Sequence, residues 1–270
     1  MLQAMLLIII FIMGIYFGSF FTLATYRLPI GEDITHKHSY CPSCNHKLGI
    51  MDLIPVFSYL FLGAKCRYCK KRIGIRYFLF EILTGIFFVL FFVSLKIDIY
   101  TLTINNLIYI FISILYFSGL FIISGIEKEK NIIQKSVLVY ELIVSILYMI
   151  YSYTLTKNNV YEYVIYLSIM LVLILIDSIF FKKKLNYNYV IQVLMLMLCI
   201  IIFSGVNIAI CTIILTIISI GFKNILQTII RNQKSKVIQK QVRTPYIFFL
   251  CVSNLIVIIM VNFLNNYIIK

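Results

Sequence analysis

The strongest constraint on this chain is a succession of apolar segments, each about long enough to cross a lipid bilayer as a helix. One crossing takes about 20 predominantly apolar residues. Eight such segments follow one another, at residues 4–25, 78–95, 102–126, 137–155, 161–181, 189–204, 206–222 and 246–266. Because a lipid core leaves exposed backbone groups without hydrogen bonds, the sequence predicts an all-α polytopic membrane protein with about eight transmembrane helices.

Composition agrees with a chain that lies mostly in lipid. Hydrophobic residues make up 62% of the sequence and charged residues only 13%, whereas about a quarter of the residues in soluble domains are charged. The segment 204–206 is so short that it predicts a tight hairpin between the sixth and seventh runs. No basic stretch precedes the first run and no small-residue cleavage site follows it, so we expect this run to be a retained helix.

The net charge of +14 lies in the gaps between the apolar runs. Lysine and arginine favour the cytoplasmic side of a membrane. All of them except Lys96, Lys157 and Lys270 lie in alternate gaps, at 26–77, 127–136, 182–188 and 223–245. This pattern predicts cytoplasmic loops at these gaps and both termini outside, with the lipid bilayer rather than nucleic acid as the partner of the basic residues.

The basic segment 223–245 also carries apolar residues such as Ile225 and Ile229 between its charges. This pattern predicts either a short amphipathic helix on the anionic inner leaflet or a solvated basic loop.

One polar insert interrupts the apolar runs near the start of the chain. It contains two CxxC pairs, Cys41 with Cys44 and Cys66 with Cys69, with 21 residues between the pairs. This spacing is typical of a four-thiolate zinc ribbon, and cytoplasmic thiols stay reduced. Four sulfur ligands leave no open position, so we expect a structural zinc ion; redox chemistry is the alternative. The chain therefore divides into a first helix at 1–27, a zinc-ribbon-like insert at 28–77 and a membrane domain at 78–270.

Three histidines near the insert and three cysteines in the apolar runs lie outside this ligand set. With four thiolates available, we expect the histidines to be solvated and the other cysteines to be packing residues. They are His36, His38, His46, Cys199, Cys211 and Cys251.

The residues around the insert resemble a known family. The first apolar run ends in "GSFFTLATYRLP", and the insert continues through "IPVFSYLFLGAKCRYC" to a glutamate in the second run. This order is similar to the N-terminal part of the type IV prepilin peptidases, membrane aspartic peptidases of family A24. The matching residues are Pro55, Ser58, Tyr59, Gly63, Cys66, Arg67, Cys69 and Glu81.

The resemblance implies a membrane-embedded hydrolase of the bacterial cytoplasmic membrane. It would act as an endopeptidase that removes the leader of type IV prepilins or pseudopilins at the cytoplasmic face. Many members also methylate the new N-terminus with S-adenosylmethionine. The alternative is a catalytically impaired or non-catalytic relative that acts in pilin binding or assembly.

The catalytic positions depart from the family pattern of two aspartates. Alignment places Glu127 at the first aspartate, and places Tyr189 at the aspartate of a GxGD motif that this chain lacks. A phenol is a poor general base because its pKa is ordinarily near 10. Asp177 lies inside the fifth run near its cytoplasmic end, where an ionisable residue suggests a function. We therefore expect Glu127 and Asp177 to form the catalytic pair; the alternative is that Asp177 only pairs with Lys182 or a backbone donor.

Two further acids lie in or near the apolar runs. The resemblance places Glu81 beside the insert, where we expect it to serve methyl transfer or to pair with Arg76. Glu141 lies one turn into the fourth run, near the cytoplasmic side, and we expect it to pair with Lys135.

Overall fold

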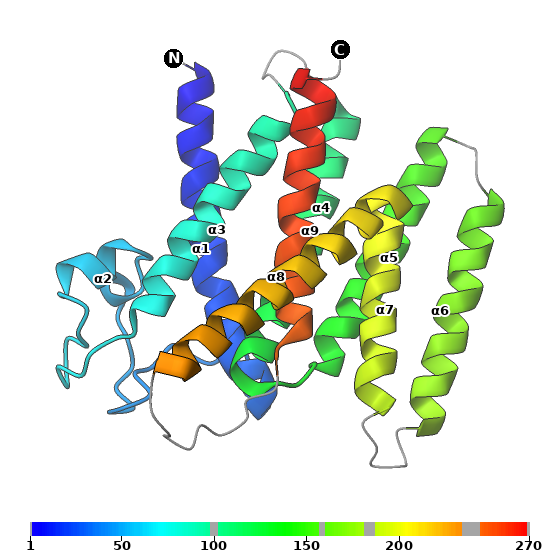
Figure 1. Ribbon diagram of the computed structural model, residues 1–270. Coiled ribbons are helices and arrows are strands. Elements are labelled where there is room, and N and C mark those ends of the chain that lie inside the picture. The colour runs from blue at the N-terminus through cyan, green and yellow to red at the C-terminus, as the bar shows by residue number, and fades with distance from the viewer. Residues whose placement is uncertain (1, 98–101, 157–159, 181–186, 234–243, 269–270) are drawn as a thin grey trace. The chain divides into compact units, whose positions relative to one another are not determined.

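The computed structural model describes residues 2–97, 102–156, 160–180, 187–233 and 244–268 (Figure 1). Over these residues the regular elements are helices, and extended pairing is limited to two isolated bridges, Tyr40 with Lys47 and Lys65 with Arg72. The expected all-α class is confirmed.

The helices follow the apolar runs along the chain. The elements are α1 (Leu2–Arg27), η1 (Leu28–Ile30), η2 (Ile50–Asp52), α2 (Phe57–Phe61), α3 (Ile75–Ser94), α4 (Ile104–Lys130), α5 (Lys135–Thr156), α6 (Val160–Phe180), α7 (Tyr187–Ser204), α8 (Val206–Gln233), α9 (Tyr246–Phe263) and η4 (Leu264–Ile268).

Six of these helices are long and apolar enough to cross a membrane, namely α1, α3, α4, α5, α8 and α9. The apolar parts of α6 and α7 are shorter, at Tyr161–Ile176 and Tyr189–Ser204. The helices together account for the eight apolar runs and make this a multi-pass membrane protein.

Glycines end and join the helices where the backbone must turn. Gly31 has a φ of 70° and closes η1, and its NH donates to the carbonyl of Leu28 at 3.2 Å. Gly205 has a φ of 84° and is the single residue between α7 and α8. Left-handed backbone is readily adopted only by glycine, so the tight hairpin expected at 204–206 is confirmed.

The basic segment after the seventh run is partly helical. The structure continues α8 without a break through Ile225 and Ile229 to Gln233. The first part of the basic segment is therefore helical, but it continues α8 and does not form a separate helix. Residues 234–243 lie outside the described residues.

The chain divides into two compact units, one of residues 1–103 with 262–270 and the other of residues 104–261. In the first unit α1 packs along α3, and the two backbones almost touch. A Cβ added at Gly14 would lie 2.8 Å from the Cα of Gly85, and one added at Gly18 would lie 3.0 Å from the Cα of Glu81. Small residues spaced four apart allow this close approach in membrane helices, so the three glycines form the seam between α1 and α3.

In the second unit α5 packs against both α4 and α7, and α7 also packs against α6 and α8. A buried polar chain crosses its interior. The Tyr116 hydroxyl donates to Asn254 Oδ1 at 2.8 Å, and Asn254 Nδ2 donates to Thr212 Oγ1 at 3.2 Å. The Tyr116 ring stacks on Phe203 with centroids 3.8 Å apart. Hydrogen bonds between buried side chains hold membrane helices together where hydrophobic association cannot.

Glu141 differs from the expectation. It is fully buried in α5, and neither carboxyl oxygen has a hydrogen-bond partner among the described residues, so the expected pair with Lys135 is wrong. The reason lies on α4, where Gly119 leaves room for the side chain: a Cβ at Gly119 would lie 2.1 Å from Glu141 Oε1. The glycine therefore creates the space that the carboxyl fills.

We predict that Gly119→Ala destabilises the protein by about 1–3 kcal/mol, because the methyl group overpacks a filled site. The second change Glu141→Ala should recover much of this loss, because it empties the same space. Thermal unfolding in detergent measures both effects. Gly221→Ala is the matched control, since a Cβ there meets nothing within 4 Å. Additive losses in the double variant would contradict the prediction.

Candidate functional site

The two CxxC pairs lie on turns of the same backbone design. The NH of Asn45 donates to the carbonyl of Cys41 at 2.8 Å, and the NH of Lys70 donates to the carbonyl of Cys66 at 3.0 Å. Asn45 and Lys70 are both left-handed, with φ values of 56° and 58°. Each turn also carries one of the isolated bridges. The sequence repeat is therefore also a structural repeat.

The two turns bring the four sulfur atoms together. The Sγ atoms of Cys41, Cys44, Cys66 and Cys69 all lie within 4.8 Å of one another, and those of Cys41 and Cys69 are 3.9 Å apart. Cys41 and Cys66 are buried, while Cys44 and Cys69 are exposed. Four thiols at this separation form a cluster that can hold a metal ion.

Two of these thiols, Cys41 and Cys44, have pKa values that lie on opposite sides of the ordinary value. Burial raises the pKa of Cys41, but hydrogen bonds from the NH groups of Ser43 and Cys44 and from the thiols of Cys44 and Cys66 together lower it to about 7. The NH of His46 lowers the pKa of Cys44, but burial and the neighbouring thiols prevail and raise it to about 11. Four negative charges cannot share this space alone, and a cation at its centre would remove the conflict.

A small polar network braces the second turn from outside. Arg67 Nε donates to Asp52 Oδ1 at 2.7 Å, and the Tyr68 hydroxyl donates to Asp52 Oδ2 at 3.2 Å. Burial raises the pKa of Asp52, but the hydrogen bonds from Arg67, the NH of Gly49 and Tyr68 together outweigh it, and the pKa lies below its usual value. The His46 ring packs on Tyr68 with centroids 3.6 Å apart and remains exposed, so this histidine connects the two turns while it stays in contact with solvent.

Arg27, at the end of α1, organises the loop that leads to the first turn. Its side chain is 1% exposed and donates to three backbone carbonyls. The acceptors are Asp33 at 2.9 Å, Lys37 at 2.8 Å and His38 at 2.9 Å. One buried guanidinium therefore fixes the path of the chain between α1 and the cysteines.

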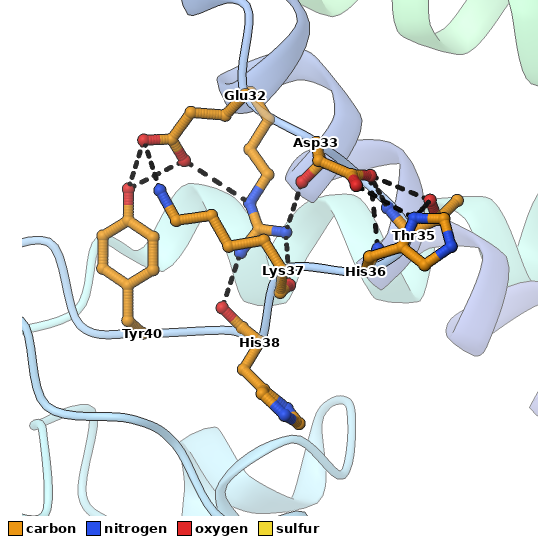
Figure 2. A network of polar contacts seen from close by, with 8 residues as sticks. Glu32, Asp33, Thr35, His36, Lys37, His38 and Tyr40 are labelled. Carbon is orange, nitrogen blue, oxygen red and sulfur yellow. Dashed lines mark hydrogen bonds and ion pairs between the residues drawn. The ribbon is translucent and has the colours of Figure 1, made fainter.

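Figure 2 shows how the side chains of this loop complete the network. Glu32 accepts from the Tyr40 hydroxyl at 2.9 and 3.0 Å and pairs with Lys37 Nζ at 2.9 Å. The contact with Lys37 is the main reason that the pKa of Glu32 lies below its usual value. Tyr40 directly precedes Cys41, so the loop anchors the first cysteine turn.

Glu81 lies on α3 and holds an unusual turn of the insert. Its Oε2 accepts from the NH of Val56 at 2.7 Å. Val56 has a φ of 64°, which a β-branched residue rarely adopts. The expected pair with Arg76 is wrong, because Glu81 caps this backbone NH while Arg76 Nη2 donates to the Tyr77 hydroxyl at 3.0 Å.

A cavity of about 610 Å³ lies within the first unit, between α1, α3 and the insert. Its lining combines aromatic, acidic and basic side chains. Among them are Tyr26, Tyr59, Tyr77, Asp52, Arg67 and Glu81. Volumes of about 300–1,000 Å³ with a few placed polar groups are typical of small-molecule sites.

The second unit holds a different centre around Glu127. This residue is 1% exposed and lies near the end of α4. The hydroxyl of Tyr189, on α7, donates to its Oε1, and the NH of Phe248, on α9, donates to its Oε2 at 2.5 Å. Three helices thus meet at one carboxyl, with one donor on each oxygen.

The structure brings together Glu127 and Tyr189, the two residues that alignment placed at the catalytic positions. The backbone of Asp177 lies in α6, but its side chain lies outside the described residues. The pairing of Asp177 with Glu127 therefore stays a prediction.

The NH of Phe248 is a contact that the sequence did not reveal. The sequence feature that could have indicated this contact is Pro245, which directly precedes Tyr246, the first residue of α9. NH groups in the first turn of a helix lack a partner inside the helix, and such a free donor meets Glu127 here.

The family model that matches this chain covers residues of the first unit. A family model described as "Bacterial Peptidase A24 N-terminal domain" matches residues 12–95. A "Prepilin leader peptidase/N-methyltransferase" of Myxococcus xanthus is 40% identical over 81 residues, 30% of this chain and 24% of the relative. A protein of the same name from Klebsiella pneumoniae is 38% identical over 87 residues, 30% of this chain and 38% of the relative.

A further protein of that name, from Bacillus subtilis, is 39% identical over 83 residues, 31% of this chain and 34% of the relative. The chain therefore covers between 24% and 38% of the length of these three relatives. No solved structure matches the chain. The expected resemblance is confirmed, and residues 12–95 match the N-terminal domain of the bacterial A24 peptidases, the type IV prepilin peptidases.

Proposed function

We propose that this protein is a membrane-embedded endopeptidase that removes the leader of type IV prepilins or pseudopilins. The observation that carries the proposal is the buried carboxyl of Glu127, which three helices hold inside an apolar bundle. An ionisable group in a membrane helix is costly, and such residues usually serve a function. The resemblance of residues 12–95 supports the choice of substrate.

The chemistry assigned to Glu127 is that of a general base. Peptide hydrolysis needs a group that takes a proton from the attacking water and later returns it to the departing amine. The two donors fix both oxygens of Glu127, so the carboxyl is held in one orientation before substrate arrives. Asp177, the second carboxyl predicted from sequence, is the first candidate for the second group of this centre.

The orientation follows from the basic loops. With the loops at 26–77 and 127–136 in the cytoplasm, Glu127 lies near the inner face of the membrane. A prepilin leader that is basic and cytoplasmic, followed by an apolar helix, would present its scissile bond at this depth.

We further propose that the four cysteines hold a structural zinc ion. A tetrahedral ion with Zn–S bonds of about 2.3 Å separates its sulfur ligands by about 3.8 Å. The 3.9 Å between Cys41 and Cys69 fits that geometry. The ion would connect the two turns and leave the peptide chemistry to the second unit.

A methyl-transfer step would belong to the cavity of the first unit. The names of the relatives include N-methyltransferase, and S-adenosylmethionine carries a positively charged sulfonium. Aromatic faces and carboxylates attract such a cation. Tyr59, Tyr77, Asp52 and Glu81 supply both kinds of group to the cavity.

We predict that Glu127→Gln lowers cleavage of a co-expressed cognate prepilin by about 10²-fold or more, because an amide cannot accept the proton. N-terminal sequencing of the pilin measures the outcome. Glu129→Gln is the matched control, since this acid is exposed two residues away. Unchanged cleavage by Glu127→Gln would contradict the peptidase assignment, and full cleavage by Asp177→Asn would remove Asp177 from the pair.

The purified protein is expected to contain one zinc ion per chain, measured by elemental analysis. Cys66→Ser should lose the metal and lower the unfolding temperature, because a structural zinc site supplies folding free energy. Cys211→Ser should keep both, because Cys211 lies on α8 in the other unit. Full metal content after loss of Cys66 would refute the four-cysteine site.

S-adenosylmethionine is expected to bind the purified protein and to protect the first unit from unfolding, with Tyr59→Ala weakening binding but keeping the zinc content. Equilibrium dialysis with labelled ligand measures the affinity. Tyr153→Ala, on exposed α5 surface, is the control. Equal binding by the Tyr59 variant would place the methyl donor elsewhere.

A further inference from the structure

Two donors contact the carboxyl of Glu127, and the action of Glu127 as a general base does not by itself use the second of them, the hydroxyl of Tyr189. Among the described residues, its Oε2 accepts from the NH of Phe248 and its Oε1 accepts from the hydroxyl of Tyr189. The backbone NH is part of α9 and cannot leave. The phenol lies at the end of a side chain, so of the two donors it is the one that a side-chain rotation would redirect.

Peptide hydrolysis needs two kinds of group at this point. One takes a proton from water, and the other donates a hydrogen bond to the carbonyl oxygen as negative charge develops on it. In an aspartic dyad the second carboxyl, when protonated, supplies the donor. A phenol is also a donor, and because its pKa is ordinarily near 10 it keeps its proton at neutral pH.

We propose that Tyr189 is a catalytic residue, and that its hydroxyl donates a hydrogen bond to the carbonyl oxygen of the scissile peptide while Glu127 acts on the water. This inference rests on the proposed function and names the second group of the same centre. Tyr189 takes the role that the sequence assigns to Asp177, while the peptidase assignment itself is the same with either group.

The steps balance without any other reactant. Water attacks the carbonyl carbon as one of its protons moves to Glu127 Oε1, and the new C–O bond leaves a tetrahedral oxyanion. The Tyr189 hydroxyl, which turns from Glu127 to this oxygen, stabilises the charge and keeps its own proton. The C–N bond then breaks, and Glu127 returns the proton to the leaving nitrogen. The products are a carboxylic acid and an amine.

The fixed contact of Phe248 makes this exchange workable. Its NH holds Oε2 at 2.5 Å throughout, so Glu127 does not turn when Tyr189 leaves Oε1 for the substrate. Oε1, no longer occupied by the Tyr189 hydroxyl, then takes the proton from the water. Phe248 acts as a positioning residue through its backbone.

The test compares Tyr189→Phe with the wild type on a purified prepilin in detergent. The loss of one oxyanion donor typically costs about 10²–10³-fold in kcat. We expect a fall of that size in kcat, with KM and zinc content unchanged. Tyr161→Phe is the matched control, because this tyrosine is 87% exposed on α6 and should cleave at the wild-type rate.

The outcomes separate this inference from the proposed function. Cleavage by Tyr189→Phe at the wild-type rate would overturn the role of Tyr189 and leave the peptidase assignment standing. A wild-type protein that binds the prepilin but never cuts it would overturn the assignment itself. If Tyr189→Phe unfolds, Asp177→Asn decides instead: wild-type cleavage by that variant supports Tyr189, and a loss as large as that of Glu127→Gln overturns it.

Discussion

Three buried ionisable side chains make hydrogen bonds to the main chain, and these bonds fix the backbone at three places in this protein. Arg27 binds three carbonyls of the loop before the cysteines. Glu81 binds the NH of Val56 inside the insert. Glu127 binds the first turn of α9. Each buried charge determines where a neighbouring segment can run, so the polar residues, few as they are, define the shape of both candidate sites.

Each of the two units contains one of the candidate sites. The first holds the cysteine cluster and the cavity, and its insert has little regular structure. Side-chain networks hold the insert in shape, and the four cysteines can hold a metal ion. The second is a helical bundle whose interior contains a polar chain and one carboxyl with two donors. Division of this kind allows the cysteine region and the region around Glu127 to be altered separately by mutation.

Sequence reasoning predicted most of the fold, because each apolar run carries its own signal of length and hydropathy. The cysteine cluster was also predictable, because the spacing of Cys41, Cys44, Cys66 and Cys69 is local. Contacts between distant segments were not. Glu141 was assigned to Lys135 on the same helix, whereas its environment depends on Gly119 on another helix. The NH of Phe248 was missed because a backbone donor has no sequence signature beyond the proline before it.

The seam of Gly14, Gly18 and Gly85 has a mechanical consequence for the insert. The backbones of α1 and α3 meet there without an intervening layer of side chains, so the spacing of these helices is set by main-chain atoms. The insert leaves the end of α1 and returns at the start of α3. The distance between the two ends of the insert is therefore fixed by the packing of α1 against α3. A ligand in the cavity has to fit this distance, because the helices cannot move apart without breaking their backbone contact.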